Sequence, residues 1–310
     1  MTTCVDSGCG PDDDARVRTV CPPVEDQSSG CPGPASEIFK QAAEEIPPDL
    51  KYPFLTPRWL QNKLNKMQRQ QGSTTVRLLV TGVDEASVDA AIRPLPFRRS
   101  MRVWYESDLE SAIIKLLPSP MHDVTASQFF LEVASAIHSL PGHGFLSLTA
   151  IGASKFNCQG KRSKEGDAGV RCTTRTGAAA WPNLMIEVGC SESTRMLRLD
   201  AQWWLAASGG LTRMVILIKV KDRPVNSLHL EVWRFLPNPQ AQRTRQAPSH
   251  MPTSTKTIKI DAAGVVAPAG ALLTIPYADL FDVGYINAVD VVFTTAQISQ
   301  FAQFVFLQCA

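Results

Sequence analysis

The chain contains 310 residues, of which 44% are hydrophobic and 19% charged, and its formal net charge at pH 7 is only +2. This length fits one large domain or two small ones, with enough apolar material for a core. The low and balanced charge argues against a histone-like tail, an acidic solvating chain and a coiled coil. The longest aliphatic run, residues 214–218, is far shorter than the roughly 20 apolar residues of a membrane span, so we expect no membrane contact.

Residues 1–50 are predicted to be a disordered leader, because proline, aspartate, serine and glycine dominate and the apolar residues show no period. The first residues contain neither the basic nor the apolar part of a secretory signal, so we expect an intracellular protein, cytoplasmic or nuclear. The leader contains cysteines that lack the closely spaced pair of a zinc site: Cys4, Cys9, Cys21 and Cys31.

Residues 51–120 are predicted to form an N-terminal extension that begins with a basic helix. Thr56 is a typical helix cap and Pro57 fits a first helical turn, so we expect a helix over residues 58–71. The apolar face of this helix consists of Leu60, Leu64 and Met67. Its other side carries four basic residues and no acid: Arg58, Lys63, Lys66 and Arg69. Strands are expected at residues 75–81, 102–105 and 112–117, the last two as a pair.

Residues 121–236 are predicted to form the core of the protein. A helix is expected over residues 125–139, followed by strands at residues 145–151, 167–172 and 184–188. A second helix, capped by Ser191 or Ser193, is expected to run to Ser208, before strands at residues 214–220 and 228–235. The order of helix, three strands, helix and two strands predicts an α/β fold with a mixed sheet and helices on its faces.

Three further expectations concern local features. Residues 157–166 are predicted to be a polar loop, residues 237–256 a polar linker or insertion, and residues 257–310 a C-terminal segment that packs on the core. Trp203 and Trp204 are neighbours on a helix and cannot share one face. We therefore expect one of them in the core and the other half-exposed or in an interface.

Two acidic residues in the predicted core are candidates for a metal site. Asp167 and Glu187 lie on successive strands, at similar distances from the turn that joins them, so an antiparallel hairpin would place them side by side. Two such carboxylates repel each other and suit Mg²⁺ or Mn²⁺, with Glu132 on the preceding helix as a third acid. Glu187 also interrupts an otherwise apolar strand, where an acid is costly unless it is paired or metal-bound. An ion pair with Arg171 or Arg195 is the alternative explanation.

The arrangement of these elements resembles the core of the PD-(D/E)XK nuclease superfamily, which has the restriction-endonuclease-like fold. Both share a helix, a hairpin with an Asp, a central strand with a Glu, a helix and a strand. The segments around both acids also resemble a set of uncharacterised fungal proteins. These segments are Ser163-Lys164-Glu165-Gly166-Asp167, Trp181-Pro182-Asn183-Leu184-Met185-Ile186-Glu187-Val188-Gly189 and Asp200-Ala201-Gln202-Trp203-Trp204-Leu205.

The resemblance implies an α-β-β-β-α-β core with N- and C-terminal additions, and metal-dependent phosphodiester hydrolysis of DNA or RNA. Asp167 and Glu187 would hold Mg²⁺ or Mn²⁺, and Glu132 would match the acid of the first helix. Two residues depart from the motif, because Gly189 stands where it has a lysine and Gly166 where it has a proline. Lys164 or Arg195 would then supply the positive charge that stabilises the transition state.

A basic segment follows the predicted loop and is a candidate for binding phosphates. The residues expected to contact a nucleic-acid backbone are Lys161, Arg162, Arg171 and Arg175. The alternative is that these basic residues only belong to the solvent-exposed surface of a nearly neutral protein. Two functions stay open: an active Mg²⁺-dependent nuclease, and an inactive nuclease-like module that binds nucleic acid or a protein partner. A metal bound between Asp167 and Glu187 would favour the first, and an ion pair that closes their pocket would favour the second.

Overall fold

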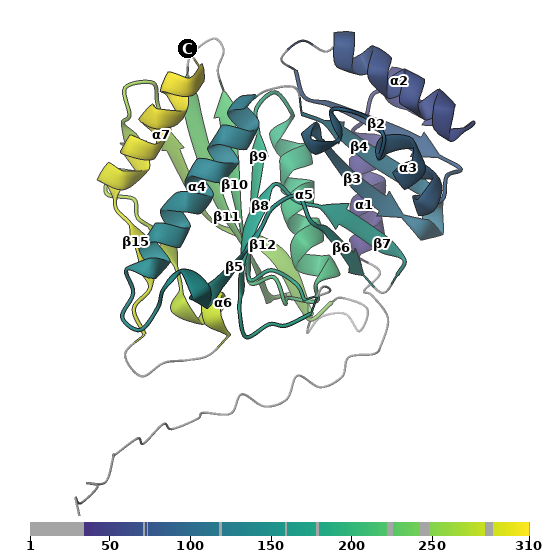
Figure 1. Ribbon diagram of the computed structural model, residues 1–310. Coiled ribbons are helices and arrows are strands. Elements are labelled where there is room, and N and C mark those ends of the chain that lie inside the picture. Colours follow the sequence, from purple (N-terminus) through teal and green to yellow (C-terminus); the bar gives the residue numbers. More distant parts are fainter. Residues whose placement is uncertain are drawn as a thin grey trace, which may run out of the picture.

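The computed structural model describes residues 34–70, 72, 74–117, 120–158, 160–177, 180–221, 226–241, 248–282 and 288–309. The first 33 residues of the predicted leader, with its four cysteines, lie outside this range. The protein is a mixed α/β structure in which two large sheets lie next to each other, with helices packed on their faces (Figure 1). Within the described residues, no helix combines the length and apolar character needed to cross a membrane.

The N-terminal sheet has the strand order β1-β2-β4-β3-β7-β6. Its strands are β1 (Lys51–Pro53), β2 (Val76–Thr81), β3 (Met101–Glu106), β4 (Ser111–Leu116), β6 (Lys155–Cys158) and β7 (Arg162–Glu165). Helices α2 (Pro57–Gln70) and α3 (Glu85–Ile92) cover one face, where Leu60 and Leu64 pack with strand residues such as Leu78. The predicted basic helix, the strand at 75–81 and the following strand pair are therefore confirmed, whereas α3 was not predicted.

The C-terminal sheet has the strand order β13-β12-β11-β10-β9-β8-β5. Its strands are β5 (Leu148–Ile151), β8 (Ala168–Cys172), β9 (Leu184–Gly189), β10 (Met214–Lys221), β11 (Ser227–Pro237), β12 (His250–Ile260) and β13 (Val266–Ala267). Only β9 and β10 run parallel, and the other neighbouring strands are antiparallel. The sheet is thus mixed, and β9 lies in its interior, as the apolar sequence of that strand indicates.

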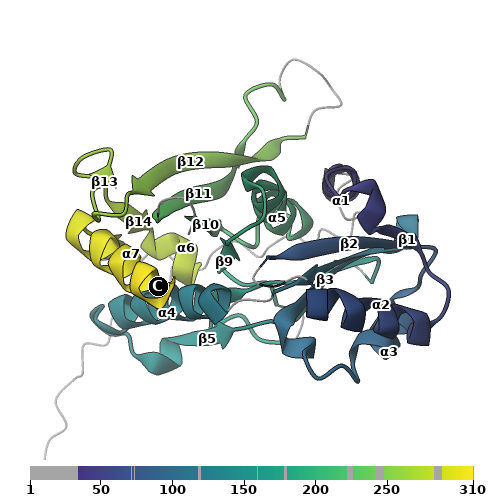
Figure 2. The same cartoon turned by 90° about the horizontal axis from the view of Figure 1, so that it is seen from above.

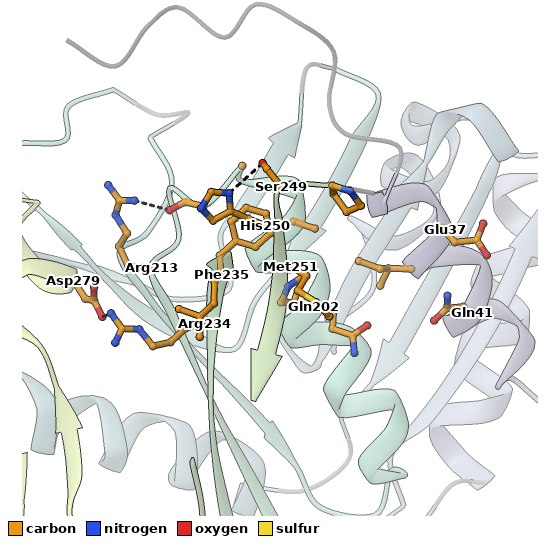
Figure 3. Close-up of a pocket in the computed structure, with 17 residues that line it drawn as sticks. Glu37, Gln41, Gln202, Arg213, Arg234, Phe235, Ser249, His250, Met251 and Asp279 are labelled. Carbon is orange, nitrogen blue, oxygen red and sulfur yellow. Dashed lines mark hydrogen bonds and ion pairs between the residues drawn. The ribbon is translucent and has the colours of Figure 1, made fainter. Parts of the chain in front are cut away.

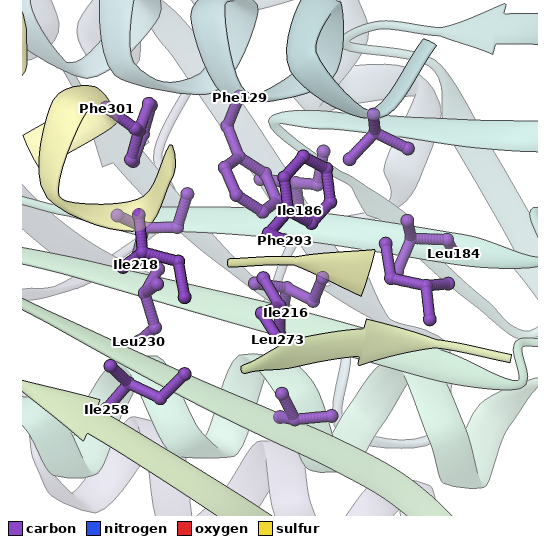
Figure 4. Packing of buried hydrophobic residues seen from close by; sticks show 14 of the residues in the cluster. Phe129, Leu184, Ile186, Ile216, Ile218, Leu230, Ile258, Leu273, Phe293 and Phe301 are labelled. Carbon is purple, nitrogen blue, oxygen red and sulfur yellow. The ribbon is translucent and has the colours of Figure 1, made fainter. Parts of the chain in front are cut away.

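Helices cover both faces of the C-terminal sheet (Figure 2). On one face lie α4 (Pro120–His138) and α7 (Thr295–Cys309), together with the short helix α6 (Tyr277–Phe281) and the ribbon of β14 (Leu273–Ile275) and β15 (Val291–Phe293). Phe129, Phe293 and Phe301 meet there above Ile186 and Ile216 of the central strands (Figure 4). On the other face lies α5 (Thr194–Ala207), which begins at the cap Ser193 and ends before Gly209, as predicted.

The predicted disordered leader is wrong for residues 34–50. Residues Pro34–Glu44 form helix α1, which packs against α5 and fully buries Phe39. The ring of Phe39 meets that of Trp104 edge to face, with centroids 5.2 Å apart. The buried residues Ala35, Ile38 and Ala42 do recur at helical spacing, but the polar and proline-rich composition of residues 1–50 as a whole hid this pattern.

Both predicted loops contain regular strands. The polar segment 157–166 forms most of the β6–β7 hairpin, and the second half of the predicted linker 237–256 belongs to β12. In β12 the polar residues are mostly exposed at the outer part of the sheet, which hides its hydrophobic pattern. In β7 all four residues are buried although each is polar, because their charges are paired with other buried side chains.

The expectation for the two neighbouring tryptophans is also wrong, because Trp203 and Trp204 are both fully buried. Helix α1 covers the side of α5 that faces away from the C-terminal sheet. Trp203 meets the ring of Trp104 on β3, and Trp204 meets the ring of Phe156 on β6, so the N-terminal sheet helps to bury both. Trp204 points toward Glu187, to which its indole Nε1–H donates a hydrogen bond.

Candidate functional site

Nine buried ionisable side chains meet where the two sheets join, and we call this group the polar centre. None of the nine is more than 9% exposed. Four are bases from the N-terminal sheet and four are acids from the C-terminal half, with a histidine from the start of α4. The members are Arg77, Arg102, Lys115 and Lys164, then Asp167, Glu187, Glu192 and Asp200, and finally His122.

The basic side chains form a row across neighbouring strands. Arg77 on β2 is paired in register with Lys115 on β4, and Lys115 is paired with Arg102 on β3. Strand alternation places them on the face opposite Leu78, so they point away from α2 and α3. Like charges directly opposite one another destabilise a sheet. This row is therefore stable only because acids of the C-terminal half face it.

Asp167 lies where the chain passes from β7 of one sheet to β8 of the other, and three cations surround it. Its Oδ2 is 2.9 Å from His122 Nε2 and 3.7 Å from Lys115 Nζ, and its Oδ1 is 3.2 Å from Arg102 Nε. The backbone N–H of Val188 also donates to Oδ2, at 3.0 Å. Burial by itself raises the pKa of Asp167, but the charges of His122, Lys115 and Arg102 hold it well below its usual range. Asp167 is thus an anion at neutral pH.

Glu187 on β9 is held by a lysine and a tryptophan. Its Oε1 is 3.2 Å from Lys164 Nζ and accepts a 2.5 Å hydrogen bond from Trp204 Nε1. Burial raises the pKa of Glu187 to about 7, an effect that Lys164 opposes and the negative charge of Asp167 reinforces. Lys164 Nζ also lies 2.8 Å from Asp200 Oδ1 and 5.4 Å from the ring centroid of Trp104. The lysine therefore has acidic and aromatic partners at once.

The sequence did not single out Arg77, Lys115, Glu192 and Asp200 as site residues, although all belong to the polar centre. Arg77 Nε donates to Glu192 at 2.9 Å, and Arg77 Nη2 is 2.5 Å from Asp200 Oδ2. Lys115 Nζ lies 2.9 Å from Glu192 Oε1. Arg77 and Lys115 each interrupt an apolar strand, which is the same signal that singled out Glu187. For Glu192 and Asp200, near and on a helix, no comparable signal exists.

The polar centre does not fit the divalent metal that the resemblance implies. Oxygens of Asp167 and Glu187 already contact basic side chains. In the described ranges, no group of three or more His, Cys, Asp and Glu residues is arranged to hold a metal ion. The free space beside Lys115, Lys164 and Glu187 is about 10 Å³. That volume is about the minimum for a single water molecule.

The two glycines that depart from the nuclease motif lie in tightly packed surroundings. A Cβ atom at Gly189 would lie 3.0 Å from the side chain of Glu192 and 3.1 Å from Leu197 Cδ2. A Cβ at Gly166 would lie 2.2 Å from the Met185 methyl group and 2.9 Å from the Trp204 ring. The space that the motif gives to lysine and proline is therefore filled by the chain's own side chains.

Two predicted catalytic residues lie outside the polar centre. Glu132 is half-exposed on α4 and accepts a hydrogen bond from Gln128 at 2.9 Å, with no contact to Asp167 or Glu187. Arg195 is 66% exposed and lies 3.1 Å from Glu45. Lys164 and Arg195 were the two candidates to replace the motif lysine, and the fold brings Lys164 to Glu187. This happens because β7, the strand of Lys164, runs beside β3 at the junction of the sheets.

The predicted phosphate-binding residues are mostly engaged within the protein. Arg162 is buried, 2.6 Å from Glu106 and 3.0 Å from Asp108. Arg175 forms ion pairs with Asp282, and Arg171 donates to two backbone carbonyls. Lys161, which is 63% exposed, is 4.0 Å from Asp108. Three of the four cations are thus engaged in contacts within the fold.

A separate groove of about 870 Å³ lies between α1, α5 and the ends of β11 and β12 (Figure 3). Its wall contains Arg234, which is paired with Asp279 at 2.6 Å, and Arg213, which is 3.4 Å from Asp282. His250 stacks on Phe235, with ring centroids 5.6 Å apart. Since its arginines are neutralised by neighbouring acids, the groove shows no charge preference for a ligand.

Comparisons with known proteins add no assignment. No family model matches the chain, and a search of the curated proteins finds no match.

Proposed function

We propose that this chain is a nuclease-like protein that binds nucleic acid without metal-dependent hydrolysis. The restriction-endonuclease-like fold is part of the proposal. It is supported by the order α4, β5, β8, β9, α5 and β10, with Asp167 just before β8 and Glu187 on β9. This order corresponds to the α-β-β-β-α-β core that the resemblance implies, with the β6–β7 hairpin added to the other sheet.

The loss of hydrolysis rests on one observation: the chain's own cations hold both motif carboxylates. A metal at Glu187 would have to displace Lys164, whose ammonium group is buried. Breaking a buried ion pair costs about 3–5 kcal/mol because it leaves an uncompensated charge. A side chain at position 189, where the motif has the lysine that orients the attacking water, would also press against Glu192 and Leu197.

The binding of nucleic acid is supported by the basic residues of α2. This helix contains no acid, and none of the ion pairs among the described residues involves Arg58, Lys66 or Arg69. Positive charge is thus exposed on the N-terminal sheet's outer layer while the acids of the polar centre are buried. Such a distribution attracts a polyanion.

The test combines metal titration with cleavage and binding assays. Mn²⁺ and Mg²⁺ are titrated calorimetrically into the wild type, an Asp167→Ala, Glu187→Ala variant and a Glu44→Ala, Glu132→Ala control that removes two carboxylates outside the polar centre. We expect no binding heat at millimolar metal, no cleavage of DNA or RNA, and binding of a labelled duplex at low salt. Metal binding and cleavage that disappear only in the first variant would overturn the proposal and establish an active nuclease.

A further inference from the structure

The solvent-exposed face of α2 carries one continuous stripe of basic and amide side chains. Its members are the exposed residues Arg58, Asn62, Lys66 and Arg69. At positions i, i+4, i+8 and i+11 they fall within roughly 80° of the helix circumference. The buried residues Leu60, Leu64 and Met67 lie on the opposite side. The stripe is therefore the part of α2 that points furthest from the N-terminal sheet.

The charge of this stripe is not neutralised within the described part of the chain. No ion pair there includes a basic residue of α2, and Lys63 lies over the ring of Tyr52, 3.9 Å from its centroid. Beside the stripe is a surface depression of about 420 Å³, lined by Asn62, Asn65, Lys66, Arg69 and Gln70. Every side chain of its lining carries N–H groups, donors of the kind that contact phosphate oxygens.

We propose that this face of α2 binds the phosphate backbone of a nucleic-acid duplex, a proposal that rests on the proposed function and names its binding surface. From Arg58 to Arg69 the helix advances by eleven residues, which gives the stripe a length of roughly 16 Å. A duplex presents about ten phosphate charges over that length, since it carries one charge per about 1.7 Å. Three exposed cations on one line can thus each face a phosphate without any contact to a base.

Other polyanionic partners fit this face less well. A bilayer requires an apolar helix face, but that face of α2 is already buried against the N-terminal sheet. A single strand requires exposed aromatic rings for base stacking. The one tryptophan of α2, Trp59, is half-buried and packs edge to face on Tyr52 at 6.1 Å.

The experiment measures fluorescence anisotropy of labelled duplexes of about 20 base pairs, at NaCl concentrations between about 50 and 200 mM. One variant carries Arg58→Gln, Lys66→Gln and Arg69→Gln. The matched control carries Arg195→Gln, Lys221→Gln and Lys259→Gln, which removes the same charge from exposed positions elsewhere. Separate arms use duplex DNA, duplex RNA, a single strand, and vesicles of phosphatidylserine and phosphatidylcholine.

We expect the α2 variant to lose at least about tenfold in duplex affinity at low salt, and its salt slope to fall by about 2.7 for three lost phosphate contacts. The control keeps both values near those of the wild type. Equal binding of DNA and RNA duplexes indicates recognition of the backbone charge, and a preference identifies which duplex is the partner.

Three outcomes would overturn the inference in different ways. If the α2 variant binds as tightly as the wild type, the surface is wrong while the proposed function stands. If the wild type binds neither duplex, the proposed function fails as well. If a single strand or the vesicles bind more tightly than both duplexes, the partner is wrong.

Discussion

Lys164 Nζ lies 3.2 Å from Glu187 Oε1, and the two side chains are only 4% and 3% exposed. The contact joins β7 of the N-terminal sheet to β9 of the C-terminal sheet, at the acid that the resemblance assigns to a metal. A lysine that belongs to the protein thus takes the electrostatic place of a divalent cation. It also ties the two sheets together.

Removing one acid of the polar centre should destabilise the whole protein. Asp200→Asn leaves Arg77 and Lys164 without a shared anion in a buried place. We expect the free energy of unfolding to fall by about 3–5 kcal/mol. Glu132→Gln, on the half-exposed face of α4, is the control and should change it by less than about 0.5 kcal/mol. Urea unfolding of both variants measures the difference, and equal effects would contradict a structural role for the polar centre.

The raised pKa of Glu187 predicts that stability falls as the pH rises from about 4.5 to about 7. In this interval the folded protein keeps a proton that the unfolded chain has released, so deprotonation favours unfolding. Glu187→Gln should therefore flatten this part of the curve, by on the order of 1–3 kcal/mol between the two ends. The lowered pKa of Asp167 makes the stability increase as the pH rises, but only at lower pH values.

Denaturant unfolding between pH 4.5 and 7 tests this expectation. His122 also has a raised pKa, so its contribution is lost as the pH rises above its ordinary value of 6.5, and this part should remain in the Glu187→Gln variant. A wild-type curve that rises through the whole interval would show that Glu187 is ionised in the folded protein at low pH.

Two neighbouring residues of the predicted phosphate-binding segment should behave differently. Arg162→Ala leaves the fully buried Glu106 without its partner, and we expect a loss of about 3 kcal/mol in unfolding free energy. Lys161→Ala should leave stability within about 0.5 kcal/mol, because this side chain is exposed. Duplex affinity of the Lys161 variant should match that of the wild type. A large loss of affinity there would move the binding surface from α2 to the β6–β7 turn.

Helix α1 should contribute to stability although its sequence resembles a linker. Phe39→Ala removes a fully buried ring that packs on Trp104, and we expect a cost of about 3–5 kcal/mol. Lys40→Ala on the same helix is exposed and should change little. Thermal unfolding monitored by tryptophan fluorescence compares the two. If both variants melt like the wild type, α1 does not pack on α5 in solution.

Regular elements of the core could be predicted because their burial leaves a periodic pattern. The strand β9 is apolar apart from Glu187, and β10 is apolar apart from two lysines, while α5 has a serine cap and a glycine stop. The pattern failed for β7, whose four polar residues are all buried. A periodic pattern of apolar residues cannot indicate a strand whose buried side chains are polar and form ion pairs.

The sequence by itself determined the α/β class, the boundaries of the central elements and the position of Glu187 as a costly buried charge. Only the tertiary structure decided what neutralises that charge. The cations of the polar centre come from strands that are separate in the chain. The side chains of Arg77, Lys115 and Lys164 nevertheless lie on one face of the same sheet. Which charges are paired depends on which strands become neighbours. The order of the strands in turn depends on how the two sheets pack, and no local pattern in the sequence indicates that packing.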